Sequence, residues 1–231
     1  MLAVLTVVVA AGCGGGGGAK KTTGTTAAPA PSTSPGPSTT DTARTARAQA
    51  AVLQPSDFPP GWTTFPPDEG LHLDALWQDL MRCLGIERAA QPLAMALSPT
   101  YVKGIATQAR TMVQYSPARA VAAIEGALTG PKSQECLTQA FTADAERSKP
   151  EASRPGPSTV SPLQVPPAGQ KTLSWRVTLT MFLSELQVPI FQDFLVVFDG
   201  ERVMPMFFLN PGSPFPPDLE RQLVQDVVGR A

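Results

Sequence analysis

The sequence predicts an α+β domain, with a mainly antiparallel sheet and helices packed on it, preceded by a disordered tether. Segments of alternating apolar and polar residues indicate strands, and segments with apolar residues three and four apart indicate amphipathic helices. The dipeptide Asp199-Gly200 between two strand segments is typical of a hairpin turn. Because strands joined by hairpins run antiparallel, the sheet is expected to be mainly antiparallel.

A short apolar run opens the chain and indicates export. Residues 2–12 carry no charge and fall well short of the roughly 20 residues that span a bilayer. Small residues from Ala10 to Gly12 lead directly to Cys13, and this pattern is similar to a bacterial lipobox, whose cysteine is acylated after cleavage. We expect residues 1–12 to be a signal peptide and Cys13 to be the site of lipid attachment.

Two further expectations concern this end of the chain. No Lys or Arg precedes the apolar run, although signals usually begin with one, so we expect the natural start codon to lie upstream. The alternative, that the run is a buried helix or strand, would leave it beside five unsupporting glycines, Gly14–Gly18. Residues 13–48 are mostly Gly, Thr, Ser, Pro and Ala, which predicts a flexible linker before a single domain over residues 49–231.

Charge and cysteine content narrow the class of protein. With 18 Lys and Arg against 19 Asp and Glu, the chain has no basic field for a nucleic acid, which we therefore do not expect as a partner. Once Cys13 is acylated, Cys83 and Cys136 are the only pair that an oxidising compartment could join. The disulfide Cys83–Cys136 is predicted, with two buried free thiols as the alternative.

The elements follow in order along the domain. The prolines between Pro55 and Trp62 exclude a helix there. The large side chain of Trp62 is expected to pack against the core. Apolar spacing then predicts helices over residues 71–84, 117–128 and 131–145, and at the end over 218–228. Alternation predicts strands over residues 105–115 and 173–181, and the Asp199-Gly200 turn predicts two more over residues 190–198 and 201–209. Residues 149–170 are expected to form a long loop with a short edge strand near Val160, and Pro205 to mark an edge strand or a bulge.

Candidate binding residues come from the first of these strands. Gln108, Arg110 and Gln114 share its predicted solvent-facing side, and Trp62 lies near it in principle. We name these four as candidate ligand contacts, against the alternative that they are ordinary solvent-exposed residues.

Catalytic and metal chemistry have little support. His72 is the sole histidine, so a serine or cysteine nucleophile lacks a base and a zinc site lacks ligands. Acidic residues could act in pairs, but those that cluster in sequence are predicted on a loop and on the polar face of a helix. They are Asp68, Glu69, Asp74 and Asp79. We expect no cofactor, no metal and no enzymatic activity.

The order of motifs resembles a broad group of actinobacterial exported lipoproteins. The segments that carry the resemblance are Asp57–Trp62, Cys83–Gly85, Tyr115–Pro117, Glu135–Leu137 and the Asp199-Gly200 hairpin. That group is related to the extracellular sensor domain of the mycobacterial kinase H family and to PsbP-like α+β domains. The resemblance implies export, this fold and a binding cleft beside the sheet, without a kinase domain.

These observations predict a lipoprotein held on the extracytoplasmic face of the cell membrane by its N-terminal lipid. We expect a non-enzymatic, sensor-like module that binds a small molecule, an envelope component or a protein. The alternative is an envelope hydrolase or transferase that uses carboxylates. A cavity lined by apolar groups and amides would favour binding, and a cavity with two carboxylates of displaced pKa would favour the enzyme.

Overall fold

The computed structural model of the chain describes residues 39–65, 70–104, 106–149, 153–183 and 185–230. The predicted signal peptide, Cys13 and most of the predicted linker lie outside the described residues, as do Asp68 and Glu69. Among the described residues, no helix combines the length and apolar character that crossing a bilayer requires.

One antiparallel sheet of nine strands forms the centre of the described domain, which confirms the α+β class. Its main path runs β1-β3-β4-β9-β8-β7-β5, with β2 beside β4 and β6 beside β7. The strands are β1 (Trp62–Thr64), β2 (Ala94–Leu97), β3 (Tyr101–Lys103), β4 (Thr107–Tyr115), β5 (Ser153–Pro155), β6 (Thr159–Pro162), β7 (Lys171–Leu183), β8 (Leu186–Asp199) and β9 (Arg202–Pro211).

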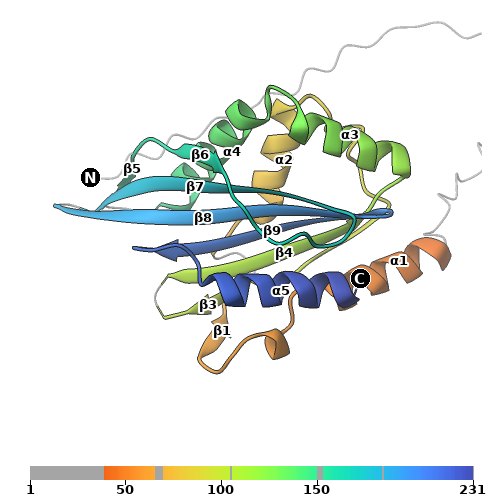
Figure 1. The fold of residues 1–231 in the computed structure, drawn as a ribbon, viewed down its shortest axis with the longest axis horizontal. Coiled ribbons are helices and arrows are strands. Elements are labelled where there is room, and N and C mark those ends of the chain that lie inside the picture. Colours follow the sequence, from red (N-terminus) through yellow and green to blue (C-terminus); the bar gives the residue numbers. More distant parts are fainter. Residues whose placement is uncertain (1–38, 66–69, 105, 150–152, 184, 231) are drawn as a thin grey trace, which may run out of the picture. The chain divides into compact units, whose positions relative to one another are not determined.

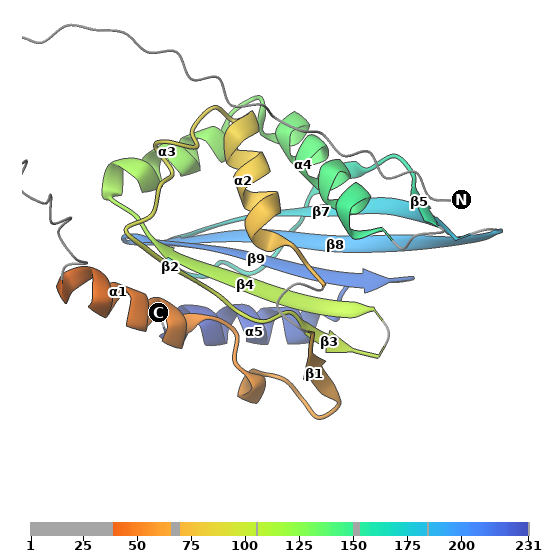
Figure 2. The same cartoon turned by 180° about the vertical axis from the view of Figure 1, so that it is seen from behind.

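Helices cover both faces of this sheet. On one face lie α2 (Leu73–Cys83), α3 (Ala118–Thr129) and α4 (Ser133–Ser148), and on the other lie α1 (Thr39–Ala51) and α5 (Pro217–Arg230) (Figure 1). Figure 2 shows the same three layers from behind. A single 3-10 turn, η1 (Pro55–Asp57), connects α1 to the first strand.

The central strands are apolar on both faces because each face has a helical layer. On β8, Phe194 and Val196 belong to the core under α2, α3 and α4, whereas Leu195 and Val197 belong to the core under α1 and α5. This arrangement gives β8 a nearly continuous apolar run in place of the alternation expected of a sheet with one solvated side. Gly200 has a φ of +62° and closes the β8–β9 hairpin, as the Asp-Gly pair predicts.

The predicted disulfide is confirmed. Cys83 at the end of α2 is bonded to Cys136 in α4, with 5.5 Å between their Cα atoms. The two helices also pack along their lengths over the sheet, so the bridge joins elements that contact each other extensively.

Helix α1 begins at Thr39, ten residues before the predicted domain boundary at Gln49. The segment is rich in Ala and Arg, which favour helix, but it lacks the large apolar residues that make a helix periodic. Its contact with the sheet depends on small side chains: Ala48 and Ala51 are fully buried in the same core as Ala94 and Ala96 of β2. Apolar periodicity therefore missed it.

Pro205 lies in a central strand, which corrects the predicted edge position or bulge. β9 runs between β4 and β8, and Pro205 is paired with Val196 of β8. On the β4 side the ladder is interrupted at Met204 and Pro205 and resumes at Val203 in the same register. Proline has no N–H to donate, and the sheet accommodates it by leaving Met204 and Pro205 unpaired on the β4 side. No residue is inserted, so this is not a bulge.

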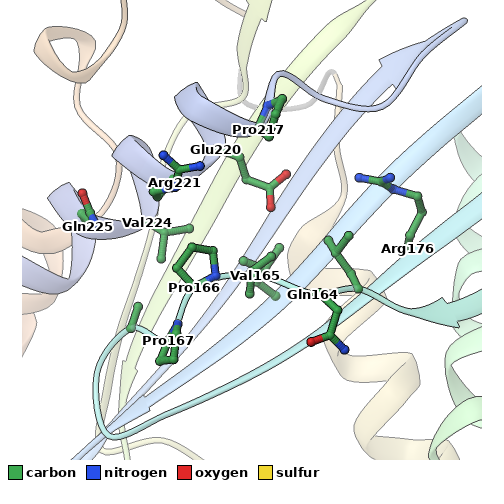
Figure 3. A pocket seen from close by; sticks show the side chains of 13 residues that line it. Gln164, Val165, Pro166, Pro167, Arg176, Pro217, Glu220, Arg221, Val224 and Gln225 are labelled. Atoms are coloured by element: carbon green, nitrogen blue, oxygen red, sulfur yellow. The ribbon is translucent and has the colours of Figure 1, made fainter.

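Two other predictions differ from the structure. The predicted solvent-facing side of β4 is wrong: from Ala109 to Tyr115 every residue is buried, because α2 covers that face and α1 the other. The predicted loop over residues 149–170 contains the expected short edge strand, β6, and also a strand that was not predicted, β5; both pair with β7. Part of this segment, residues 163–168, then crosses the face of the sheet on which α5 lies (Figure 3).

Candidate functional site

A cavity of about 400 Å³ lies between the sheet and the ends of α2 and α4. We call it the helix-side cavity. Strands β4, β7, β8 and β9 form its floor, and the start of α2 and the last turn of α4 form its roof. Its lining residues are Phe65, Gly70, Leu71, His72, Ala106, Gln108, Asp144, Ala145, Arg147, Ser148, Leu179, Met181, Ile190, Gln192, Leu209 and Pro211.

Strand register places two amides in one row across the floor. Gln108 of β4 and Gln192 of β8 are both paired with Leu209 of β9, so they flank it. Their Cα atoms are therefore two strand spacings apart, roughly 10 Å. The next row towards the β7–β8 turn is apolar, with Leu179 opposite Ile190.

The segment that leads into α2 requires glycine at position 70. Gly70 has a φ of +84°, and a Cβ there would lie 2.7 Å from Phe65 and 2.8 Å from Thr100. The chain can therefore pass close to both side chains before Leu71 and His72 reach the roof of the cavity.

Asp144 is the buried acid of the roof. Burial, opposed mainly by the nearby charge of Arg147, raises the pKa of Asp144 to about 6. Arg147 Nη2 lies 3.5 Å from Asp144 Oδ1, an ion pair too long and too poorly aligned to be a hydrogen bond. Arg147 instead donates to Asp79 Oδ2 at 2.6 Å. The side chain of Asp144 is thus desolvated and only weakly compensated.

Three side-chain oxygens at this cavity are buried and have no hydrogen-bond partner: Oε1 of Gln108, Oε1 of Gln192 and Oδ1 of Asp144. Gln192 is only 4% exposed and Asp144 only 2%. Leaving a buried acceptor without a partner costs about 1–3 kcal/mol. Their concentration at one cavity means that water or a bound molecule must supply the missing partners.

The four residues predicted as ligand contacts do not converge. Gln108 lines the helix-side cavity, but Gln114 lines a separate groove between α2 and β2, where it donates a hydrogen bond to Ser116. Arg110 lies between these two sites and donates to the carbonyl oxygens of Ser98 and Leu71, and burial lowers its pKa. Trp62 lies in the core on the other face of the sheet.

The groove beside Gln114 has a volume of about 510 Å³ and includes the exposed side chain of Met95. Among the described residues that line it, no buried side-chain atom lacks a hydrogen-bond partner. It therefore offers apolar surface without the unpaired polar groups that distinguish the helix-side cavity.

A charged cluster lies on the opposite face of the sheet, beneath residues 163–168, which we call the strap. Arg176 of β7 forms two hydrogen bonds with Asp193 of β8. Glu220 extends from α5 towards the side of the sheet that carries Arg176 (Figure 3). Burial, followed by the charge of Asp193 and a hydrogen bond with it, raises the pKa of Glu220 to about 8. The adjoining pocket is small, about 130 Å³.

The described residues contain no group of three or more His, Cys, Asp or Glu side chains arranged to hold a metal ion. No known protein-family model matches the chain, and no curated protein matches it either.

Sequence reasoning missed Asp144, Gln192 and Glu220, although a signal was present for each. Asp144 follows Leu137, Ala140 and Phe141 at the spacing of a core-facing stripe, and Glu220 precedes Leu223, Val224 and Val227 in the same way. Gln192 interrupts an apolar strand. A polar residue at a core-facing position indicates either a buried network or a site.

Proposed function

We propose that this chain is a membrane-anchored extracytoplasmic lipoprotein whose domain binds a small molecule without catalysis, in the helix-side cavity. The observation that carries the proposal is a cavity of about 400 Å³ with a largely apolar lining, at which the amide oxygens of Gln108 and Gln192 have no hydrogen-bond partner. Binding sites for small molecules typically combine such a lining with a few well-placed polar groups.

The location is proposed from Cys13 and supported by the disulfide. A bridge between Cys83 and Cys136 persists in an oxidising compartment, which agrees with export. The α+β architecture is also a feature that the resemblance to actinobacterial lipoproteins and sensor domains implies.

The alternative, an envelope hydrolase or transferase, has one observation in its favour. Asp193 and Glu220 are neighbouring carboxyl groups, and the pKa of Glu220 is displaced to about 8. However, Asp193 is fully buried and both of its oxygens accept from Arg176, so it has no face open to a substrate. The pair joins α5 to the sheet, and the binding proposal is therefore favoured.

A neutral fluorescent dye, N-phenyl-1-naphthylamine, tests binding directly. We expect its emission to rise saturably, with one dye per chain, when it is titrated into the full chain carrying Cys13→Ser. This substitution removes the acyl groups that would otherwise compete. Trp at position 106 should fill the cavity, since Ala106 lines it and is half-exposed, so Ala106→Trp should abolish the signal.

The matched control is Ala122→Trp on the exposed side of α3, which should bind the dye like the parent chain. A dye signal that does not saturate, or that survives Ala106→Trp unchanged, would show that the cavity is not a binding site.

A further inference from the structure

The floor of the helix-side cavity is polar at its inner end and apolar towards the β7–β8 turn. The row that holds Gln108 and Gln192 adjoins the row of Phe207 and Phe194 in the main core. In the other direction the floor continues only through apolar side chains, Leu179, Met181, Ile190 and Pro211. An occupant must therefore combine a polar group at one end with an apolar body.

The polar end presents acceptors. The atoms without partners are two amide oxygens and one carboxylate oxygen, and an ionised carboxylate can only accept hydrogen bonds. A ligand that satisfies them must bring N–H or O–H groups. An apolar ligand that displaced water from the cavity would leave all three acceptors unpaired.

The charge of the lining disfavours an anionic ligand. Asp144 is a buried acid, and the cation closest to it, Arg147, is shared with Asp79. His72 has its Nδ1 3.1 Å from Ser148 Oγ, and the buried guanidinium of Arg110 donates to the carbonyl oxygens of Ser98 and Leu71. A carboxylate or phosphate entering the cavity would meet Asp144 without an uncommitted cation to balance it.

We infer that the ligand of the helix-side cavity is an amphiphile whose head group donates hydrogen bonds, as a hydroxyl or an amine, and carries no negative charge. This inference rests on the proposed binding function and specifies the chemistry of the same site. The head lies at Gln108, Gln192 and Asp144, and the apolar body extends along Leu179 and Ile190 towards the β7–β8 turn.

Competition for the dye separates the head groups. Three amphiphiles share a twelve-carbon chain: monolauroylglycerol with hydroxyls, dodecylamine with an ammonium group, and laurate with a carboxylate. Each is titrated below its micellar concentration against the dye complex of the full Cys13→Ser chain, in buffer above the pKa of Asp144. We expect the hydroxyl or the ammonium compound to displace the dye at a concentration about tenfold lower than laurate, the change produced by one buried hydrogen bond.

Gln192→Leu tests whether the head group lies where we place it. Removing a buried amide whose oxygen has no hydrogen-bond partner should leave the fold about as stable, so a thermal melt of this variant should match the parent. In this variant, the ratio between the concentration of laurate and that of the hydrogen-bond-donating amphiphile needed to displace the dye should fall about tenfold. Gln164→Leu, an exposed glutamine on the strap, is the matched control and should preserve the advantage.

Each outcome decides between the two proposals. The inference about the head group is overturned if laurate competes as well as the other two compounds, or if Gln192→Leu leaves the relative affinities of the three compounds unchanged. In either case, saturable binding of the dye would still support the proposed function. If the parent chain does not bind the dye saturably, both are overturned, and the cavity holds only water.

Discussion

Arg176 and Asp193 face each other across the β7–β8 hairpin and form two parallel hydrogen bonds, from Nε to Oδ1 at 2.6 Å and from Nη2 to Oδ2 at 2.7 Å. Asp193 is fully buried, and the hydrogen bonds with it raise the pKa of Arg176. Glu220 approaches the same pair from α5. The cluster therefore links strands β7 and β8 of the sheet to helix α5.

Stability should fall as pH rises because of Glu220. Its pKa is about 8 in the folded chain and 4.5 ordinarily, so between these values the folded state holds a proton that the unfolded state has lost. The free energy of unfolding must then decrease with rising pH, by at most about 1.4 kcal/mol per pH unit. The pKa of Asp144 is raised from 3.8 to about 6, so this group also lowers the free energy of unfolding as pH rises between those two values.

Urea denaturation across this pH range measures the slope, and Glu220→Gln should reduce it above pH 6, because an amide stays uncharged and can still donate to Asp193. Glu87→Gln, at an exposed site on the other face, is the control and should keep the parent slope. A parent chain whose stability is constant from about pH 6 to pH 8 would contradict the burial of a protonated Glu220.

Replacing Arg176 should destabilise the fold more than replacing Asp193. Arg176→Met leaves the buried carboxylate of Asp193 without its partner, so we expect a loss of about 3–5 kcal/mol in the free energy of unfolding. Asp193→Leu should cost less, because Arg176 is partly exposed and can turn towards water. The double variant should recover most of the loss, which a double-mutant cycle in urea would detect.

The larger elements of the fold could be predicted from the sequence because their patterns are local. Strand β7 and helices α2, α3 and α4 follow apolar periodicities that a single segment reveals, and the Asp-Gly turn identifies β8 and β9. α1 could not be found in this way, since Ala48 and Ala51 make their contacts with small side chains on β2, a partner more than 40 residues away. The central position of Pro205 depends on strand order, which no single segment encodes.

The candidate site was less predictable for a related reason. Gln108 was chosen because it lies on an alternating strand, but its neighbour in the cavity, Gln192, lies on β8 and is brought beside it only by the pairing of both strands with β9. Arg110 and Gln114 share the strand face of Gln108, yet Arg110 donates to the carbonyl oxygens of Ser98 and Leu71, and Gln114 lines the groove between α2 and β2. Sequence indicates which residues share a face, and helix packing decides which of them share a cavity.

Replacing the acylated sulfur tests the proposed location. Cys13→Ser in the exported chain should abolish acylation, so the product should lose the mass of the attached acyl chains and leave the membrane fraction. The reason is that a hydroxyl at this position does not replace the thiol of a lipobox, and stable anchoring requires two or more acyl chains. Mass spectrometry of both membrane and soluble fractions measures the change. An unchanged mass and unchanged membrane retention would contradict the proposed anchor.

Removing the Cys83–Cys136 disulfide should weaken the fold without opening the cavity. The bridge closes a loop of 53 residues, which in the chain-entropy model contributes about 4 kcal/mol. The variant with Cys83→Ala and Cys136→Ala should therefore melt about 10 °C lower, since each kcal/mol shifts Tm by roughly 2–4 °C in a domain of this size.

Ligand affinity should change little at a temperature where this variant remains folded. The bridge joins the end of α2 to the first turn of α4, whereas the cavity lies at the opposite ends of the two helices, about 16 Å away along α2. Between these ends, the fully buried side chains of Leu76, Leu80 and Phe141 hold the helices on the sheet. Dye titration of the folded variant should give an affinity within about twofold of the parent. A much larger loss would mean that the bridge, and not this packing, holds the roof of the cavity in place.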